Sequence, residues 1–230
     1  MNWLTAEEWS ALRLSLQVAV VAVLVTLPPG MALGYFLARR QFPGKWIVEL
    51  LVNLPLVLPP VVTGYLLLIA FSTRGPLGQF LEQLFGVRVV FTWVGAVVAA
   101  SVMSFPLLVR AIRLAMQSVD PRLEQAARSL GAGWWRTFAT VLLPLSARGV
   151  LAGCVLAFAR SLGEFGATIM VAANIAGQTQ TIPLAIYSEA SRPGGLEESW
   201  RLVALSVLLA AAALAASEWL ERRQSRYEQP

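Results

Sequence analysis

The segment SVDPRLEQAARSLGAGWWRTFATVLLP, residues 118–144, lies between two long apolar runs. Its beginning has the pattern of a capped helix, because Asp120 can accept backbone N–H groups and Pro121 suits the first helical position. Gly131 permits the left-handed turn that ends such a helix. The apolar residues that recur at helical spacing are Leu123, Ala127, Leu130 and Trp134. The pattern predicts a short amphipathic helix exposed to water.

This apolar stripe has two possible environments. It can dock into a groove of a partner protein, and the small side chains of Ala126 and Ala127 would permit a close approach. It can equally lie in the lipid interface, which requires no partner. The residues of the segment alone leave both interpretations open.

Outside this segment the chain is dominated by apolar residues. Hydrophobic residues make up 57% of its 230 residues and charged residues only 13%, which is typical of a protein that has a bilayer as its solvent. The uncharged stretches between Arg13 and Arg39, between Glu49 and Arg74, and between Arg88 and Arg110 can each cross a hydrocarbon core, which needs about 20 helical residues. Three membrane spans follow from these stretches.

Two further spans are predicted in the second half of the chain. Residues 202–220 form a plausible last span, and residues 145–173 form a fourth candidate that contains Arg160 and Glu164. The fourth candidate spans only if its charges face protein or water. We therefore expect an all-α, polytopic membrane helix bundle of about five transmembrane helices, formed by residues 1–230 as a single domain.

The basic residues predict the orientation of this bundle. With five spans the two termini lie on opposite sides of the membrane, and the side richer in Arg and Lys is cytoplasmic. The smaller set is Arg13, Arg74, Arg88, Arg192 and Arg201. The larger set is Arg39, Arg40, Lys45, Arg110, Arg113, Arg122, Arg128, Arg136, Arg148, Arg222, Arg223 and Arg226. We expect a multi-pass inner-membrane protein with a periplasmic N-terminus and a cytoplasmic C-terminus.

The composition also excludes several classes of function. The chain has no histidine and a single cysteine, Cys154, so the usual zinc, haem and histidine-based sites are excluded. The net charge of +5 is spread between apolar runs rather than gathered on one basic face, so nucleic acid is not an expected partner. No phosphate-binding loop for ATP is present. We expect no catalytic residues, no metal and no cofactor.

Two intramembrane features are candidates for a pathway or gate. Pro55, Pro59 and Pro60 predict a kink or break in the second span, which serves either a gate or packing. Arg160 and Glu164, four residues apart in the fourth span, cost about 2.5 to 3.5 kcal/mol each on insertion. They either satisfy one another or a neighbouring helix, or they attract and release an anion. The candidate pathway residues are Pro59, Pro60, Arg160, Ser161, Gly163, Glu164, Phe165 and Gly166.

The polar segment resembles the loop by which permease subunits of ABC importers engage their ATPase. That loop has a Glu-Ala-Ala stretch followed by Gly and later by Leu-Pro, which correspond here to Gln125, Ala126, Ala127, Gly131, Ala132, Leu143 and Pro144. This chain departs from the pattern at its first position, where Gln125 replaces the glutamate and Glu124 lies one residue earlier. The resemblance implies the type I importer fold, with an ATPase-coupling loop at about 117–144. It implies coupling residues Leu123, Glu124, Gln125, Ala126, Ala127, Leu130, Gly131 and Ala132.

Several stretches are similar to the molybdate permeases within this class, notably LPLVLPPVVTGYLLL at 54–68 and FARSLGEFGATIMVAANIAGQTQTIPLAIY at 158–187. The resemblance implies import of molybdate, and of tungstate because the two anions are nearly the same size. It also implies a second copy of this chain, two copies of a cytoplasmic ATPase, a periplasmic molybdate-binding protein and surrounding membrane lipid as partners. A sulfate or thiosulfate permease is the nearest alternative. An ion-coupled secondary anion carrier is an alternative from another class.

Overall fold

The computed structural model describes residues 4–225, apart from the side chains at 196–198 and 220–225. Within this part of the chain every regular element is a helix. Four of the described helices are long and apolar enough to cross a membrane, and there are five such segments if a bent pair of helices counts as one broken span. The chain is therefore an all-α membrane bundle, as its apolar runs predict.

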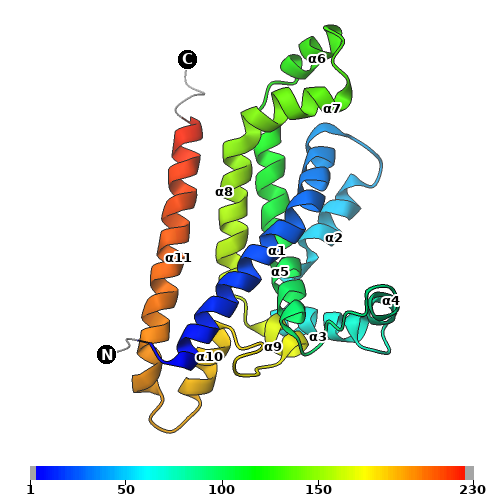
Figure 1. Ribbon diagram of the computed structural model, residues 1–230. Coiled ribbons are helices and arrows are strands. Elements are labelled where there is room, and N and C mark those ends of the chain that lie inside the picture. Colours follow the sequence, from blue (N-terminus) through cyan, green and yellow to red (C-terminus); the bar gives the residue numbers. More distant parts are fainter. Residues whose placement is uncertain (1–3, 226–230) are drawn as a thin grey trace.

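The long helices run side by side along the bundle (Figure 1). They are α1 (Ala6–Arg39), α5 (Trp93–Gln117), α8 (Leu143–Leu162) and α11 (Leu196–Ser225). α8 is extended at its beginning by the short helix α7 (Trp134–Thr137) and by a π-helical turn, η1 (Phe138–Leu142), so that one membrane-length segment covers Trp134–Leu162. The predicted first, third and last spans are confirmed by α1, α5 and α11.

α5 lies at the centre of the bundle. Of its apolar stretch 67% is buried, compared with 28% for α1 and 17% for α11. Leu108 and Ile112 of α5 are fully buried and pack in one cluster with Ala157 of α8. α1 approaches so closely that a Cβ added to Gly34 would lie 2.5 Å from Cγ2 of Ile112. The outer helices keep large apolar side chains exposed, as expected of surfaces that face lipid.

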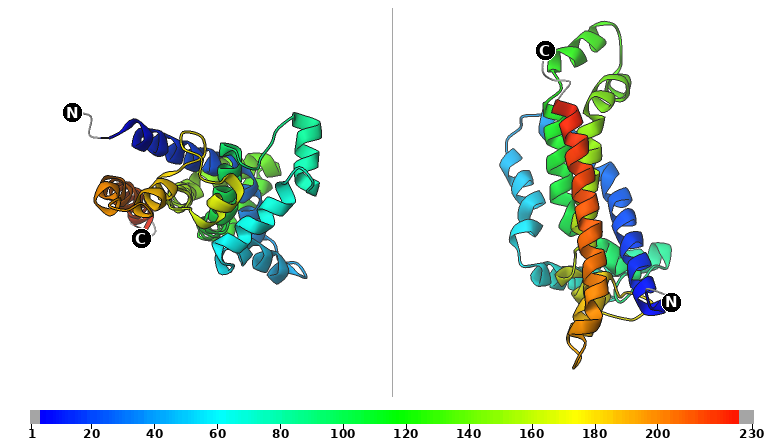
Figure 2. Two further views of the ribbon diagram at one scale, coloured as in Figure 1. Left: turned by 90° about the horizontal axis from the view of Figure 1, so that it is seen from below. Right: turned by 90° about the vertical axis from the view of Figure 1, so that its left-hand side faces the viewer.

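The second span is broken, as its prolines predict. α2 (Lys45–Val57) and α3 (Pro60–Phe71) are inclined at 111° to each other. Pro59 precedes α3 and Pro60 occupies its first turn, where its missing N–H costs nothing. α2 is held against α5 by an ion pair of 2.8 Å between Glu49 and Arg113. α3 leads into α4 (Pro76–Phe85), which projects away from the bundle in the left view of Figure 2.

The predicted fourth span, residues 145–173, is wrong at both ends. The helix already begins at Trp134 and ends at Leu162, and the remainder forms a separate short helix, α9 (Gly166–Ala172). The chain leaves the helix at Gly163, and the carboxylate of Glu164 then accepts the N–H of Ala167 in the first turn of α9. A polar side chain at this point satisfies the backbone of a new helix, so Glu164 lies at a break rather than within a span.

The two ends of the bundle differ. The N-terminal end of α1 lies with α3, α9 and α10 (Ile182–Ala190), whereas the C-terminal end of α11 lies on the side of α6 (Pro121–Ser129) and α7 (Figure 1). The right view of Figure 2 shows α6 beyond the end of the long helices. Three of the arginines assigned to the cytoplasmic side, Arg222, Arg223 and Arg226, lie outside the described side chains.

Candidate functional site

The predicted amphipathic helix is present as α6, with the caps that its sequence indicates. The carboxylate of Asp120 accepts the backbone N–H of Arg122 at 2.8 Å, and Pro121 lies in the first turn. At the other end Gly131 adopts φ of 84°, and the N–H of Ala132 donates to the carbonyl of Ala127 at 3.1 Å. This closure satisfies carbonyl groups that the helix end leaves free.

The free surface of α6 carries apolar side chains. Leu123 is 47% exposed and Leu130 is 89% exposed, while Gln125 and Ala126 are exposed and Ala127 is half-buried. Nothing lies within 4 Å of a Cβ added to Gly131. An apolar surface at the end of the bundle, in a segment of otherwise polar residues, is a candidate docking site for another protein.

Trp134 does not continue this stripe, contrary to the spacing argument. The turn at 131–133 redirects the chain, and the indole N–H of Trp134 donates to the hydroxyl of Tyr35 in α1 at 2.9 Å. The indole ring also packs on Phe138, with ring centroids 5.8 Å apart. Trp134 therefore fastens α7 to α1 instead of facing outward with Leu130.

Glu124 has a structural partner that the sequence analysis did not identify. It is 7% exposed, and its Oε1 lies 2.6 Å from Nε of Arg39 at the end of α1. Nη2 of Arg39 donates in turn to the carbonyl of Val119, just before α6, at 2.9 Å. The only sequence signal was that an acid stands one position before the expected glutamate. The ion pair joins α6 to the first membrane helix.

Arg160 and Glu164 contact each other. Nη1 of Arg160 lies 2.7 Å from Oε2 of Glu164, and Oε1 of Glu164 accepts the N–H of Ala167 at 2.8 Å. Glu164 is 3% exposed, whereas Arg160 is only partly buried. The sequence left open whether these two charges pair or serve transport, and within one chain their geometry is that of an ion pair. The side chain of Arg160 keeps 28% of its surface exposed.

The broken second span meets α9 at a very close approach. A Cβ added to Gly166 would lie 2.8 Å from Cβ of Pro60, and one added to Gly64 would lie 2.8 Å from Cα of Ala167. Only glycine fits at these two positions. The structure thus brings Pro60 and Gly166 together, although they are far apart in the sequence. Pro59 stands directly before Pro60.

The other predicted pathway residues are arranged differently. The hydroxyl of Ser161 is buried and donates to the carbonyl of Ala157 in its own helix, so it does not face an open pathway. Phe165 packs against Tyr187 of α10, with ring centroids 5.2 Å apart. Gly163, Phe165 and Tyr187 line an apolar cleft of about 660 Å³ between α8, α10 and α11.

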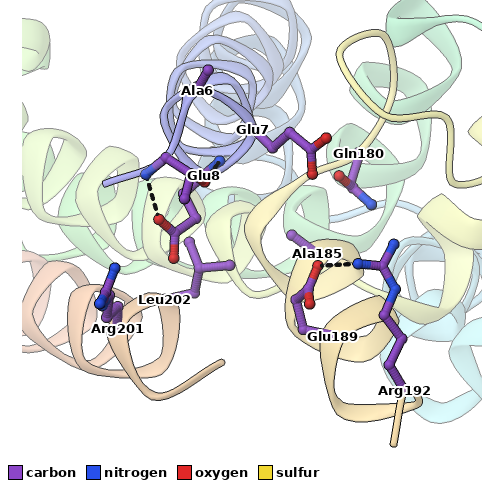
Figure 3. Close-up of a pocket in the computed structure, with 10 residues that line it drawn as sticks. Ala6, Glu7, Glu8, Gln180, Ala185, Glu189, Arg192, Arg201 and Leu202 are labelled. Carbon is purple, nitrogen blue, oxygen red and sulfur yellow. Dashed lines mark hydrogen bonds and ion pairs between the residues drawn. The ribbon is translucent and has the colours of Figure 1, made fainter. Parts of the chain in front are cut away.

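A polar pocket at the opposite end of the bundle from α6 was not predicted. It has a volume of about 540 Å³ and lies between the first turn of α1, the residues around α10 and the beginning of α11 (Figure 3). Glu189 and Arg192 point toward each other there, with Oε1 and Nη1 3.0 Å apart. Its charged lining residues are Glu7, Glu8, Glu189, Arg192 and Arg201. They come from separate elements, so no local pattern reveals them.

Residues 30–226 match the family model described as "Binding-protein-dependent transport system inner membrane component". The chain belongs to this family. The match begins within α1 and includes both α6 and the contact between α3 and α9. This inner membrane component is therefore a transport subunit with several membrane spans.

Named relatives of this inner membrane component are similar over most of their length. It is 55% identical to "Molybdenum transport system permease protein ModB" of Escherichia coli K12, over 95% of this chain and 96% of that protein. It is 52% identical to the Haemophilus influenzae protein of the same name, again over 95% of this chain and 96% of that protein. "Sulfate transport system permease protein CysT" of Salmonella typhimurium is 39% identical over 77% of this chain and 64% of its own length.

Solved structures of low sequence identity have the same fold. A bacterial ABC transporter involved in the import of alginate has a TM-score of 0.70 at 18% identity, covering 99% of this chain and 82% of that one. The MetNI methionine ABC transporter has a TM-score of 0.65 at 17% identity, covering 93% and 94%. The inner membrane component thus has the fold of ABC importer permeases.

Proposed function

We propose that this chain is the permease subunit through which an ABC importer moves molybdate, and tungstate by the same route, from the periplasm to the cytoplasm. The observation that carries the proposal is the 55% identity to a molybdenum transport permease over 95% of the chain. The named sulfate permease is less similar, at 39% over 77% of the chain. This difference favours molybdate over sulfate as the cargo.

ATP hydrolysis takes place on a separate subunit that docks on α6. The exposed side chains of Leu123 and Leu130 supply apolar surface for that contact, flanked by the small residues Ala126 and Ala127. Because Glu124 and Arg39 are ion-paired, displacement of α6 by the ATPase is passed directly to α1. Predicted coupling residues therefore have two roles, since the exposed ones contact the ATPase and Glu124 faces the membrane domain.

The working complex contains two copies of this chain, two copies of the ATPase and a periplasmic molybdate-binding protein. The α6 end of the bundle is cytoplasmic, because it contains most of the basic residues, including Arg122, Arg128 and Arg136. The polar pocket of Figure 3 then faces the periplasm. The N-terminus is periplasmic and the C-terminus cytoplasmic.

The broken span and α9 form the gate of the pathway. Pro60 and Gly166 meet where the two short helices α3 and α9 pack together, with Pro59 directly before Pro60, so a small rotation of either helix would change the opening. Arg160 supplies positive charge for a dianion, and its pairing with Glu164 keeps that attraction weak enough for release.

The proposal is tested by uptake of labelled molybdate into proteoliposomes that contain this chain with its ATPase and binding protein. We expect uptake that requires ATP and that excess sulfate does not suppress. Efficient suppression by sulfate would assign the chain to sulfate transport instead. Uptake that continues without ATP and stops when the membrane potential is collapsed would identify an ion-coupled carrier.

A further inference from the structure

A groove of about 760 Å³ lies along the outer side of α1 and α7 at the α6 end of the bundle. Six aromatic side chains line it together with Met31 of α1, and they are those of Tyr35, Phe36, Phe42, Trp134, Trp135 and Phe138. Phe36 and Trp134 are 43% and 39% exposed, so the groove is open to its surroundings. The proposed function uses none of this surface except Trp134, which anchors α7.

The groove changes in polarity along its length. Its lining residues on α1 begin at Pro28 and continue past the helix end to Arg40 and Gln41. At a rise of about 1.5 Å per residue, Pro28 and Arg40 are separated by about 18 Å along the helix. One leaflet of a bilayer has a hydrocarbon depth of about 15 Å, half of the core. The apolar part of the groove therefore has the length of an acyl chain.

The polar end of the groove is positively charged. Arg40 is exposed, and its guanidinium forms no ion pair with any carboxylate among the described residues. Nζ of Lys45 donates to the backbone carbonyl of Arg40 at 3.1 Å, so a second cation lies at the backbone of the same residue. The neighbouring acids are already paired, Glu124 with Arg39 and Glu49 with Arg113. An anionic group at this position would face two uncompensated positive charges.

We propose that this groove binds one phospholipid with an anionic headgroup in the leaflet on the α6 side. The acyl chain lies along Met31 and Phe138, and the headgroup phosphate contacts Arg40 with Lys45 beside it. Aromatic side chains such as Trp135, which is 74% exposed, lie at the depth where membrane proteins place their aromatic belts. Because α7 and the end of α1 form the groove, the bound lipid fastens the base of α6 to the bundle.

Native mass spectrometry of the intact complex tests this site, with phosphatidylglycerol and phosphatidylcholine of identical acyl chains as the two probes. We expect preferential binding of phosphatidylglycerol to the wild-type complex. Arg40→Gln should weaken that binding about fivefold, the effect expected of one arginine at an anionic membrane surface. Arg74→Gln removes the same charge from an exposed loop at the opposite end and should leave the preference unchanged.

A second variant tests the apolar part of the groove. Ala32 lines it and is exposed, so Ala32→Phe fills the space without entering the core. We expect this variant to lose bound phosphatidylglycerol while the complex remains assembled. Equal binding of the two lipids by the wild type, or an unchanged preference in Arg40→Gln, would overturn the proposal. Full lipid binding by Ala32→Phe would also overturn it, since the groove would then be occupied by something else, such as a second copy of the chain.

Discussion

Glu124 of α6 and Arg39 of α1 form an ion pair whose atoms Oε1 and Nε are 2.6 Å apart, with both side chains largely buried. Arg39 also donates to the carbonyl of Val119, so it also binds the segment that leads into α6. Through this ion pair, α6 is attached directly to α1, the first membrane helix.

Breaking the Arg39–Glu124 pair should uncouple ATP hydrolysis from transport. Glu124→Gln removes the charge but keeps a similar shape, and Arg39→Gln does the same on the other side. We expect transport per ATP hydrolysed to fall in each single variant. The double variant should be no worse than either one, because each single variant already breaks the interaction between the two contacting side chains. Strictly additive losses would show that the two side chains act independently.

Leu130 is the most exposed member of the apolar stripe, so it should contribute to ATPase docking and not to folding. Burial of a leucine side chain at an interface stabilises by about 1.5–3 kcal/mol. We therefore expect Leu130→Glu to weaken copurification with the ATPase more than tenfold, and Leu130→Met to retain it. The thermal stability of the isolated membrane subunit should be the same in both variants.

Gly131 is required for its backbone conformation and not for space, because φ is 84° and nothing lies within 4 Å of an added Cβ. A β-branched residue in this conformation is strained by about 1–2 kcal/mol, whereas asparagine tolerates it. We predict that Gly131→Val impairs ATP-driven uptake and that Gly131→Asn largely preserves it. Equal impairment by both variants would indicate instead that the ATPase contacts this position.

Gly64 should tolerate no side chain, because an added Cβ would lie 2.8 Å from Cα of Ala167 in α9. Overpacking of this kind costs about 1–3 kcal/mol. We expect Gly64→Ala to lower the melting temperature or to alter gating, measured as ATP-independent leak of molybdate. Gly163→Ala is the matched control, because its nearest atom is 4.0 Å from the added Cβ, and it should behave like the wild type.

Glu164 has two roles that substitutions can separate. Glu164→Gln removes the ion pair with Arg160 but retains an oxygen to accept the N–H of Ala167, so we expect altered uptake in an assembled complex. Glu164→Ala also leaves that buried N–H without its acceptor, which costs about 1–3 kcal/mol. It should therefore be the less stable variant in a thermal unfolding assay. A complex that fails to assemble with Glu164→Gln would mean that the charge is needed for folding.

The sequence by itself determined those features that depend on short-range chemistry. Long uncharged runs located α1, α5 and α11, because any helix that spans a bilayer satisfies its backbone internally and presents apolar side chains to lipid. Pro59 and Pro60 located the break in the second span through their missing backbone donors. Asp120 and Gly131 located the two ends of α6, since capping requires only neighbouring residues.

Only the tertiary structure decided which distant residues meet. Arg39 and Glu124 are paired across 85 positions of sequence, and Pro60 contacts Gly166, yet nothing local to either residue indicates its partner. The predicted fourth span extended to residue 173 because the residues of α9 are as apolar as those of α8. The real end lies at Gly163, and the carboxylate of Glu164 then accepts the N–H of Ala167 in the first turn of α9, which packs on α3. Composition records how apolar a segment is, whereas its path through the bundle is set by packing against helices that are remote in sequence.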